Sequence, residues 1–212
     1  EGPYFSMEQR GAQDPKYIRN PEKEEYVSIL NYSDDIVRWT VAPELPGALE
    51  LGRELKKRGI EALVVIGGDG SYRGALALSK AGINCIGLPG TIDNDIPCTD
   101  FTIGFDTALN TIVEAVDKLR DTSSSHQRCS IIEVMGRHCG DLALEAGFGT
   151  GAEIISSSER PLSADEICDK IMDLKLSGKK HTIIVVSEKL YKVHELAKEI
   201  EERVGVESRA TV

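Results

Sequence analysis

The stretch EALVVIGGDGS, residues 61–71, decides the fold class of this chain. Its run ALVVI is apolar without polar alternation, which is typical of a parallel strand covered on both faces. Two glycines and an acid follow directly, and a helix is expected over SYRGALALSKAG, residues 71–82. A buried strand that turns at once into a helix is the repeating unit of a parallel α/β sheet.

The same alternation continues on either side of this stretch. Further buried strands are expected at residues 84–88, 129–135, 152–156 and 181–187. Helices are expected at residues 51–59, from Asp106 onward, and at residues 140–147, 163–178 and 191–205, with Ser163 and Glu166 forming a capping box. The predicted fold class is therefore α/β, with Rossmann-like parallel sheets flanked by helices on both faces.

The first part of the chain has a different texture. Residues 1–44 are rich in Pro, Gly and charge near the start and show neither clear period, so irregular structure is expected there. A domain boundary is predicted near residues 103–105, after an acid-rich loop. This divides the remainder into domains of residues 45–104 and 105–212.

Composition excludes several classes of protein. The net charge of the 212 residues is −10, which argues against a nucleic-acid binder because such proteins usually carry a basic face. No apolar run reaches the ~18–20 residues that span a bilayer, so no membrane partner is expected. The five cysteines form no C-x-x-C pair and fit buried thiols in a reducing cytoplasm.

The loop GGDGS, residues 67–71, is a candidate phosphate site. Glycines between a strand and a helix let backbone N–H groups approach a phosphate, and a helix N-terminus favours negative charge. Asp69 suits a site where Mg²⁺ accompanies the phosphates, since Mg²⁺ prefers one or two carboxylates plus phosphate oxygens. The alternative is a tight turn with Asp69 as the helix N-cap.

The loop GTIDNDIPCTD, residues 90–100, places Asp93 and Asp95 behind a buried strand. Neighbouring carboxylates repel each other and need a cation, a proton or a reacting group to offset them. Phosphoryl transfer to an alcohol needs one carboxylate near a metal and another that accepts a proton. The alternative is a loop of solvated surface acids.

Other loops offer cations and one more acid. Arg137, between two glycines in MGRHCGD, is placed to hold a phosphoryl group, although a surface salt bridge is the alternative. RDTSSSHQR, residues 120–128, and GKKH, residues 178–181, are basic turns that either bind anions or are solvated. Glu188 follows a buried strand as either an acceptor for sugar hydroxyls or a helix-capping acid.

Six segments taken together resemble the ATP-dependent 6-phosphofructokinases: ALVVIGGDGS, GLPGTIDNDI, TIGFDTAL, LRDTSSSHQR, VMGRHCGDLAL and SRATV. They occur in that family's order and spacing, from about residue 55 to residue 212. The resemblance implies a two-lobed fold and transfer of the γ-phosphate of MgATP to the 1-hydroxyl of fructose 6-phosphate. The product is fructose 1,6-bisphosphate, in glycolysis, and the family's enzymes are usually cytoplasmic homotetramers.

The resemblance also implies roles for individual residues. Gly68, Asp69, Gly70 and Ser71 would contact ATP, with Asp69 near Mg²⁺. Asp93 would be the catalytic base, with Thr91 and Asp95 beside it, and Arg137 would stabilise the transferring phosphoryl group. The substrate site would comprise Thr91, Ile92, Asp93, Arg128, Met135, Gly136, Arg137, Glu188 and Arg209, of which Arg128 and Arg209 resemble a pair that reaches the 6-phosphate across a subunit interface.

An allosteric site for ADP or phosphoenolpyruvate is implied by a second group of positions. These match Arg120, Gly151, Ala152, Glu153, Lys179, Lys180 and His181.

The phosphoryl donor can be argued from two glycines. Pyrophosphate-dependent relatives resemble GGDDS and PKTIDND, where an extra Asp and Lys fill space beside the phosphates. Gly70 and Gly90 leave that space open here, which favours ATP over the pyrophosphate-dependent alternative.

Two departures from the family point to a fragment. The family's opening strand and glycine-rich phosphate loop are not found in residues 1–45, and the sequence ends at SRATV before an expected L-G-x-x-Q-R-G-G segment. A catalytically impaired version that binds a ligand or another subunit is therefore the main alternative. Another GGDG-loop kinase, acting on a lipid or a nicotinamide nucleotide, does not explain TIDND or HQR.

Overall fold

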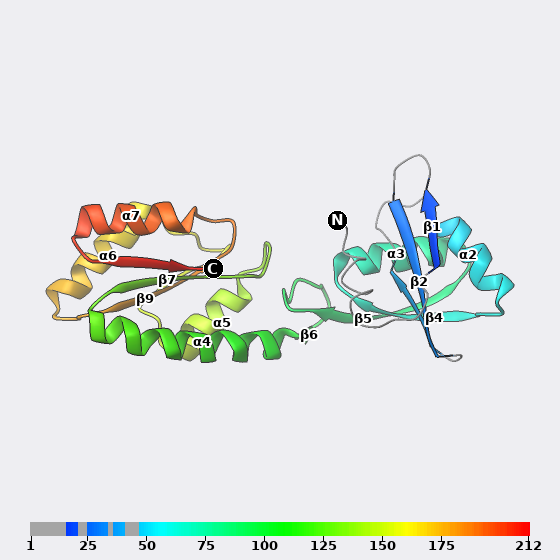
Figure 1. Cartoon of the computed structure of the whole chain (residues 1–212), viewed down its shortest axis with the longest axis horizontal. Helices are drawn as coiled ribbons and strands as arrows, with labels where there is room; N and C mark the ends of the chain where they lie inside the picture. Colours follow the sequence, from blue (N-terminus) through cyan, green and yellow to red (C-terminus); the bar gives the residue numbers. More distant parts are fainter. Residues whose placement is uncertain (1–15, 21–24, 34–35, 41–46) are drawn as a thin grey trace. The chain divides into compact units, whose positions relative to one another are not determined.

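The computed structural model describes residues 16–20, 25–33, 36–40 and 47–212 (Figure 1). The chain divides into two compact units, Glu1–Gly90 and Thr91–Val212. The division falls before the TIDND sequence, whereas the predicted boundary lay after it, near residues 103–105. The acid loop therefore belongs to the second unit.

The first unit begins with an antiparallel sheet in the order β1-β2-β3, formed by β1 (Lys16–Asn20), β2 (Glu25–Ser33) and β3 (Ile36–Thr40). Irregular structure was expected over residues 1–44, and these three strands correct that expectation. The missed signal is the β-branched and aromatic content of EYVSILNYS and IVRWT, which favours strands.

The rest of the first unit follows the predicted alternation: α2 (Gly47–Lys57), β4 (Ala62–Gly67), α3 (Asp69–Lys80) and β5 (Asn84–Thr91). Strands β4 and β5 pair in parallel from Ala62↔Asn84 to Gly67↔Pro89. The core of this unit joins α2 and α3 to the turn before β5, through Leu51, Leu55, Leu78 and Ile83.

Both faces of β4 and β5 were expected to be buried, and this expectation is wrong for the described residues. Val64, Ile66 and Ile86 expose 63%, 64% and 64% of their surface. Residues alternate between exposed and half-buried along both strands because only one face packs against the cluster of α2 and α3.

The second unit is built on a parallel sheet in the order β10-β7-β9-β8. Its strands are β7 (Cys129–Val134), β8 (Ile154–Ser156), β9 (Thr182–Ser187) and β10 (Ser208–Thr211). All six residues of β9 are buried, as its run of apolar residues predicts for a strand inside a parallel sheet. A two-residue strand, β6 (Ile103–Gly104), precedes the first helix of this unit.

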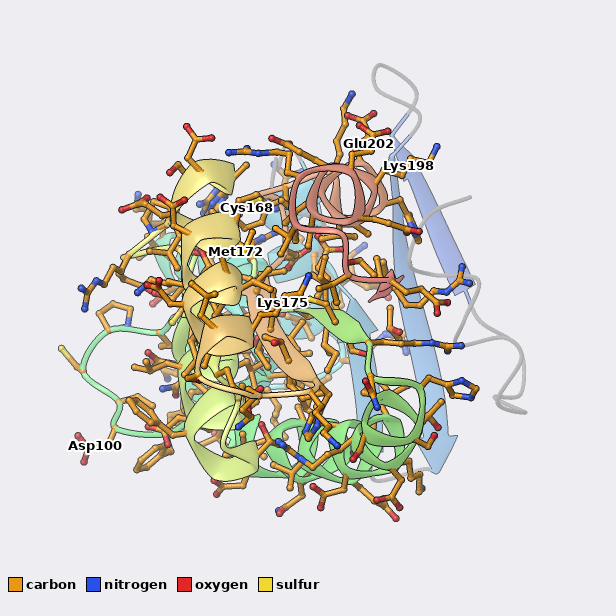
Figure 2. The ribbon with its side chains drawn as sticks, turned by 90° about the vertical axis from the view of Figure 1, so that its left-hand side faces the viewer. Asp100, Cys168, Met172, Lys175, Lys198 and Glu202 are labelled. Carbon is orange, nitrogen blue, oxygen red and sulfur yellow. The ribbon has the colours of Figure 1, made fainter. Side chains whose placement is uncertain are left out.

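Helices cover both faces of this sheet. On one face, α4 (Phe105–His126) and α5 (Asp141–Thr150) pack against Ile132, Ile183 and Val185. On the other, α6 (Ala164–Leu176) and α7 (Val193–Val204) pack against Ile131 and Ile184. Figure 2 shows α6 and α7 side by side, with Cys168, Met172 and Lys175 following one another along α6. The predicted α/β class is confirmed.

The helix ends follow their sequence signals only in part. Ser163 and Glu166 form the expected capping box at α6, and Gly205, with φ of 66°, ends α7. Asp106 lies in the first turn of α4, whose N-cap is Gly104 with φ of 110°. The left-handed backbone conformation of the N-cap favours glycine over an acid. The helix therefore begins at Phe105, two residues earlier than if Asp106 were the N-cap.

Candidate functional site

The GGDGS loop leads directly into α3. Gly68 is the N-cap, and none of the described side chains caps this end of the helix. The first N–H groups of an α-helix have no acceptor within the helix, so a bound anion can take this place. Asp69 lies in the first turn, where Oδ2 pairs with Nη2 of Arg73 at 2.7 Å, so Asp69 is not the N-cap.

Gly70 and Gly90 differ in the space that a side chain would find around them. A Cβ on Gly70 would meet nothing within 4 Å, which agrees with the open space inferred for that position. A Cβ on Gly90 would lie 2.9 Å from Cγ2 of Ile66 and 3.3 Å from the nitrogen of Gly67. The space at Gly90 is therefore filled by β4, and the inference that this position is open is wrong.

The acid loop begins the second unit. The N–H of Asp93 donates to Oγ1 of Thr91 at 3.2 Å. Burial raises the pKa of the Asp93 carboxyl, Asp95 and Glu188 raise it further, and Arg137 and the Thr91 hydroxyl oppose this rise. The structure thus brings the predicted base close enough to Asp95, Arg137 and Glu188 for their charges to act on it.

Asp95 adds an unbalanced charge to this loop. Its Oδ1 is buried and meets no hydrogen-bond partner among the residues that the structure describes. A buried polar atom without a partner costs about 1–3 kcal/mol, and more when it is charged. The loop is therefore suited to receive a cation or a hydrogen-bond donor.

The loop of Arg137 is held by Glu188. Gly136 and Arg137 have φ of 138° and 59°, and their N–H groups both donate to Oε1 of Glu188, at 3.2 and 2.6 Å. Successive N–H groups that converge in this way bind anions. A Cβ on Gly136 would lie 2.5 Å from the carbonyl oxygen of Cys139, so this turn requires glycine.

The sequence allows two roles for Glu188, and the described contacts add a third. It does not cap α7, whose N-cap is Lys192. One carboxylate oxygen instead holds the backbone on which Arg137 stands. Met135, just before this turn, is 60% exposed at the end of β7.

The predicted pair Arg128 and Arg209 meets at one carboxylate. Glu207 Oε1 lies 3.3 Å from Nε of Arg128 and 2.9 Å from Nη2 of Arg209. The parallel pairing of β10 with β7, Ser208 opposite Cys129, sets these arginines side by side. The arginines lower the pKa of Glu207, Arg209 most strongly. Nothing in the sequence singled out Glu207.

The predicted allosteric residues gather near the amino ends of the strands, as Arg128 and Glu207 do, whereas Arg137 and Glu188 follow the carboxyl ends of β7 and β9. Arg120 Nη2 donates to the carbonyl of Thr150, just before Gly151 and Ala152. Glu153 pairs with Lys179 at 2.6 Å and accepts from the N–H of Ile183 at 2.6 Å. A cavity of about 510 Å³ nearby is lined in part by Lys175, Lys179, Lys180, His181 and Glu207.

Within the ranges given above, no three His, Cys, Asp or Glu side chains group closely enough to hold a metal ion. None of the helices described there combines the length and apolar character needed to cross a membrane.

A sequence profile described as Phosphofructokinase matches residues 36–212, well over half of the chain. The chain belongs to the phosphofructokinase family. The match begins at residue 36, earlier than the start near residue 55 expected from the motifs, so β3 and α2 lie within the phosphofructokinase region.

Curated relatives of this phosphofructokinase chain include two from Clostridium species. ATP-dependent 6-phosphofructokinase 1 of Clostridium perfringens is 61% identical over 158 residues, which are 74% of this chain and 50% of that protein. ATP-dependent 6-phosphofructokinase of Clostridium botulinum is 55% identical over 168 residues, which are 77% of this chain and 53% of that protein. The chain thus spans about half the length of the curated relatives it matches.

Solved structures agree with the family. Phosphofructokinase from Saccharomyces cerevisiae matches with a TM-score of 0.69 and 33% identity, covering 78% of this chain and 26% of that chain. Pichia pastoris phosphofructokinase in the T-state matches with a TM-score of 0.68 and 27% identity, covering 76% of this chain and 19% of that chain.

Proposed function

We propose that this chain takes part in transfer of the γ-phosphate of ATP to the 1-hydroxyl of fructose 6-phosphate, giving fructose 1,6-bisphosphate in glycolysis. The observation that carries the proposal is the contact of two loops in a phosphofructokinase-family chain: Sγ of Cys139, two residues beyond Arg137, lies 3.8 Å from the carbonyl oxygen of Asn94, which stands between Asp93 and Asp95. The relatives' names, ATP-dependent 6-phosphofructokinase, support the same reaction.

Asp93 is the proposed base. A raised pKa makes a carboxylate a stronger proton acceptor, provided that it is ionised at the working pH. Arg137 beside it opposes the rise and so favours the ionised form. Thr91, which accepts from the N–H of Asp93, fixes the start of the loop, and Ile92 lies between them in the substrate site.

Arg137 is the proposed stabiliser of the transferring phosphoryl group. Preorganised cations and N–H groups lower the barrier because they need no reorganisation as charge develops. The carboxylate of Glu188 supplies such preorganisation by holding the N–H groups of Gly136 and Arg137. Met135 and Gly136 shape the sugar site, and Arg128 and Arg209 are proposed to bind the 6-phosphate.

The nucleotide side is assigned to Gly68, Asp69, Gly70 and Ser71. Asp69 fits Mg²⁺ that also binds phosphate oxygens, since such sites need only one or two protein carboxylates. Asp69 pairs with Arg73, and their side chains are 42% and 67% exposed. Such an exposed ion pair typically contributes less than about 1 kcal/mol to stability. Mg²⁺ would neutralise phosphate charge, and the N–H groups at the start of α3 would orient the phosphates.

The assay is a coupled measurement of fructose 1,6-bisphosphate formation with ATP and, separately, with pyrophosphate. Activity with ATP and little with pyrophosphate is expected, and equal rates with both donors would contradict the choice of ATP. If no product forms, calorimetry separates the alternatives. Binding of fructose 6-phosphate without turnover favours the impaired, ligand-binding version, and no binding of either substrate removes the proposal.

Assembly and regulation are also proposals. We infer a cytoplasmic homo-oligomer, a tetramer as in the family, because Arg128 and Arg209 resemble residues that reach a neighbouring subunit. ADP or phosphoenolpyruvate is the proposed effector, supported by the gathering of Arg120, Glu153 and Lys179 at one edge of the second unit. Titration of either compound, followed by calorimetry and sedimentation, tests both.

A further inference from the structure

Asn94 stands between the two acids of the TIDND loop, and every hydrogen-bonding group of its side chain is used. Its Nδ2 donates to Oδ2 of Asp141 at 2.7 Å and lies 3.5 Å from the carbonyl oxygen of Asp100. Its Oδ1 accepts from the N–H of Thr102 at 2.9 Å. One amide thus connects the acid loop to α5 and to the segment that returns toward α4.

The backbone of Asn94 makes a further connection. Its carbonyl oxygen lies 3.8 Å from Sγ of Cys139, which is two residues beyond Arg137. The residue has φ of 54°, a left-handed conformation that asparagine tolerates better than most residues. Asn94 therefore contacts the loop of Arg137 through its main chain and α5, the helix that follows this loop, through its side chain.

Asp141 is well placed to anchor this link. It lies in the first turn of α5, and α5 packs into the buried cluster through Leu142 and Ala143. A bond to a charged acceptor is stronger than one between neutral groups. Asp100, at the far side of the loop, is exposed.

From this geometry we propose that Asn94 is a positioning residue that holds the loop of Asp93 and Asp95 against the loop of Arg137. The inference rests on the proposed function for its chemical meaning, since the base and the phosphoryl-binding arginine sit on these two loops. Neither the acids nor the arginine needs Asn94 for its own chemistry. Asn94 affects only the positions of these side chains.

The test uses the whole chain and two substitutions of Asn94. Asn94→Gly removes the amide but keeps a residue that adopts positive φ freely. It therefore separates the effect of the lost side-chain hydrogen bonds from the effect of backbone strain. Asn94→Asp keeps one acceptor for Thr102 and places a carboxylate against Asp141, so like charges replace the bond. Asn110→Ala is the matched control, because the Asn110 amide donates to a helix carbonyl, that of Asp106, at 2.9 Å.

Two readouts do not need activity. Amide hydrogen exchange at Thr102 should accelerate at least about tenfold in Asn94→Gly and stay unchanged in Asn110→Ala. The ¹³C NMR titration of the Asp93 carboxyl should move toward the ordinary range for aspartate, because release of the loop lets water reach it. Unchanged exchange and an unchanged titration in Asn94→Gly would overturn the proposal.

A third readout applies when the chain forms product. Asn94→Gly should lower kcat by about 10- to 100-fold while KM for fructose 6-phosphate changes by less than about threefold. A kcat within twofold of the starting chain would overturn the proposal while leaving the proposed function standing. Absence of product from the starting chain counts against the proposed function alone, since exchange and titration still decide the role of Asn94.

The sharpest arm combines Asn94→Asp with Asp141→Asn. The pair exchanges the amide and the carboxylate, so the bond between the two side chains can form again in the opposite direction. Slow exchange at Thr102 should return in the double variant and be lost in Asn94→Asp alone. Failure of the second substitution to restore any protection would show that the Asn94–Asp141 contact does not hold the loop.

Discussion

Replacement of Glu188 tests the structure of the site most directly. In Glu188→Ala, the N–H groups of Gly136 and Arg137 lose their common acceptor, at 3.2 and 2.6 Å. A hydrogen bond to a charged group typically contributes about 1.5–3 kcal/mol, but Arg137 is exposed and water replaces part of what is lost. We expect the second unit to lose about 2 kcal/mol of stability, or roughly a 30-fold increase in opening.

The assay must report on the second unit alone, because a chain with two units need not unfold in one transition. Amide hydrogen exchange followed by mass spectrometry meets this need. Peptides from β7 and β9 report opening of the whole second unit, and the peptide over residues 135–140 reports the Arg137 loop. Glu188→Gln, which retains an acceptor oxygen without the charge, should show about half the effect.

Glu195→Ala is the matched control. Glu195 pairs with Lys192 at 3.1 Å, and both side chains are more than two-thirds exposed, 71% and 80%. Such pairs contribute less than about 1 kcal/mol, so exchange in β7 and β9 should hardly change. Equal exchange in Glu188→Ala and Glu195→Ala would refute the reasoning. A higher KM for fructose 6-phosphate with unchanged exchange would instead support a role in accepting sugar hydroxyls.

The remaining predictions concern five further positions. Asp93→Asn should raise Tm at pH 7 but not at pH 3: the pKa of Asp93 is raised by folding, so its contribution to stability is complete below the unfolded pKa and is lost as pH rises through the folded pKa. Equal gains at both pH values, or a similar gain from exposed Asp117→Asn, would contradict this. Gly136→Ala should cost about 1–3 kcal/mol through its φ of 138°, whereas Gly149→Ala, whose Cβ would meet Val113 at 3.6 Å, should not destabilise; scanning calorimetry compares them. Glu207→Gln should tighten binding of fructose 6-phosphate or inorganic phosphate by about twofold to fivefold in calorimetry, because both arginines lose the negative charge of their partner, and weaker binding would exclude competition between Glu207 and the phosphate. Gly70→Asp should leave Tm unchanged and lower ATP affinity, while Gly90→Ala should lower Tm through contact with Ile66.

The sheet of the second unit was predictable because its signals are local. Runs such as HTIIVVS and a capping box at Ser163 fix strand and helix from neighbouring residues alone, and both were confirmed. The strands of residues 16–40 were missed because the polar start of the chain was weighted over the β-branched residues further along. Coverage of β4 was misjudged because its continuous apolar run was taken to mean two buried faces, whereas Val64 and Ile66 are exposed.

The residues that organise the site are less visible in sequence because their role depends on distant partners. Asp93 and Arg137 stand out because charge beside glycine or a buried strand is unusual. Glu207 and Asn94 do not stand out, because their roles depend on distant partners. Glu207 pairs with Arg128, 79 residues away, and Asn94 bonds to Asp141, 47 residues away. Only the folded chain brings these partners together.

The balance of charge explains why these distant partners are needed. Burial makes ionisation of Asp93 less favourable and so raises its pKa, and repulsion from Asp95 raises it further. Arg137 offsets part of this, but only if its loop stays near, and Arg137 itself holds a left-handed backbone conformation that is strained for a residue other than glycine. The carboxylate of Glu188 satisfies the strained backbone, and the amide of Asn94 joins the two loops. Neither contact takes part in the proposed transfer of a proton or a phosphoryl group. Each nevertheless stabilises the close placement of the two loops, which repulsion between the carboxylates opposes.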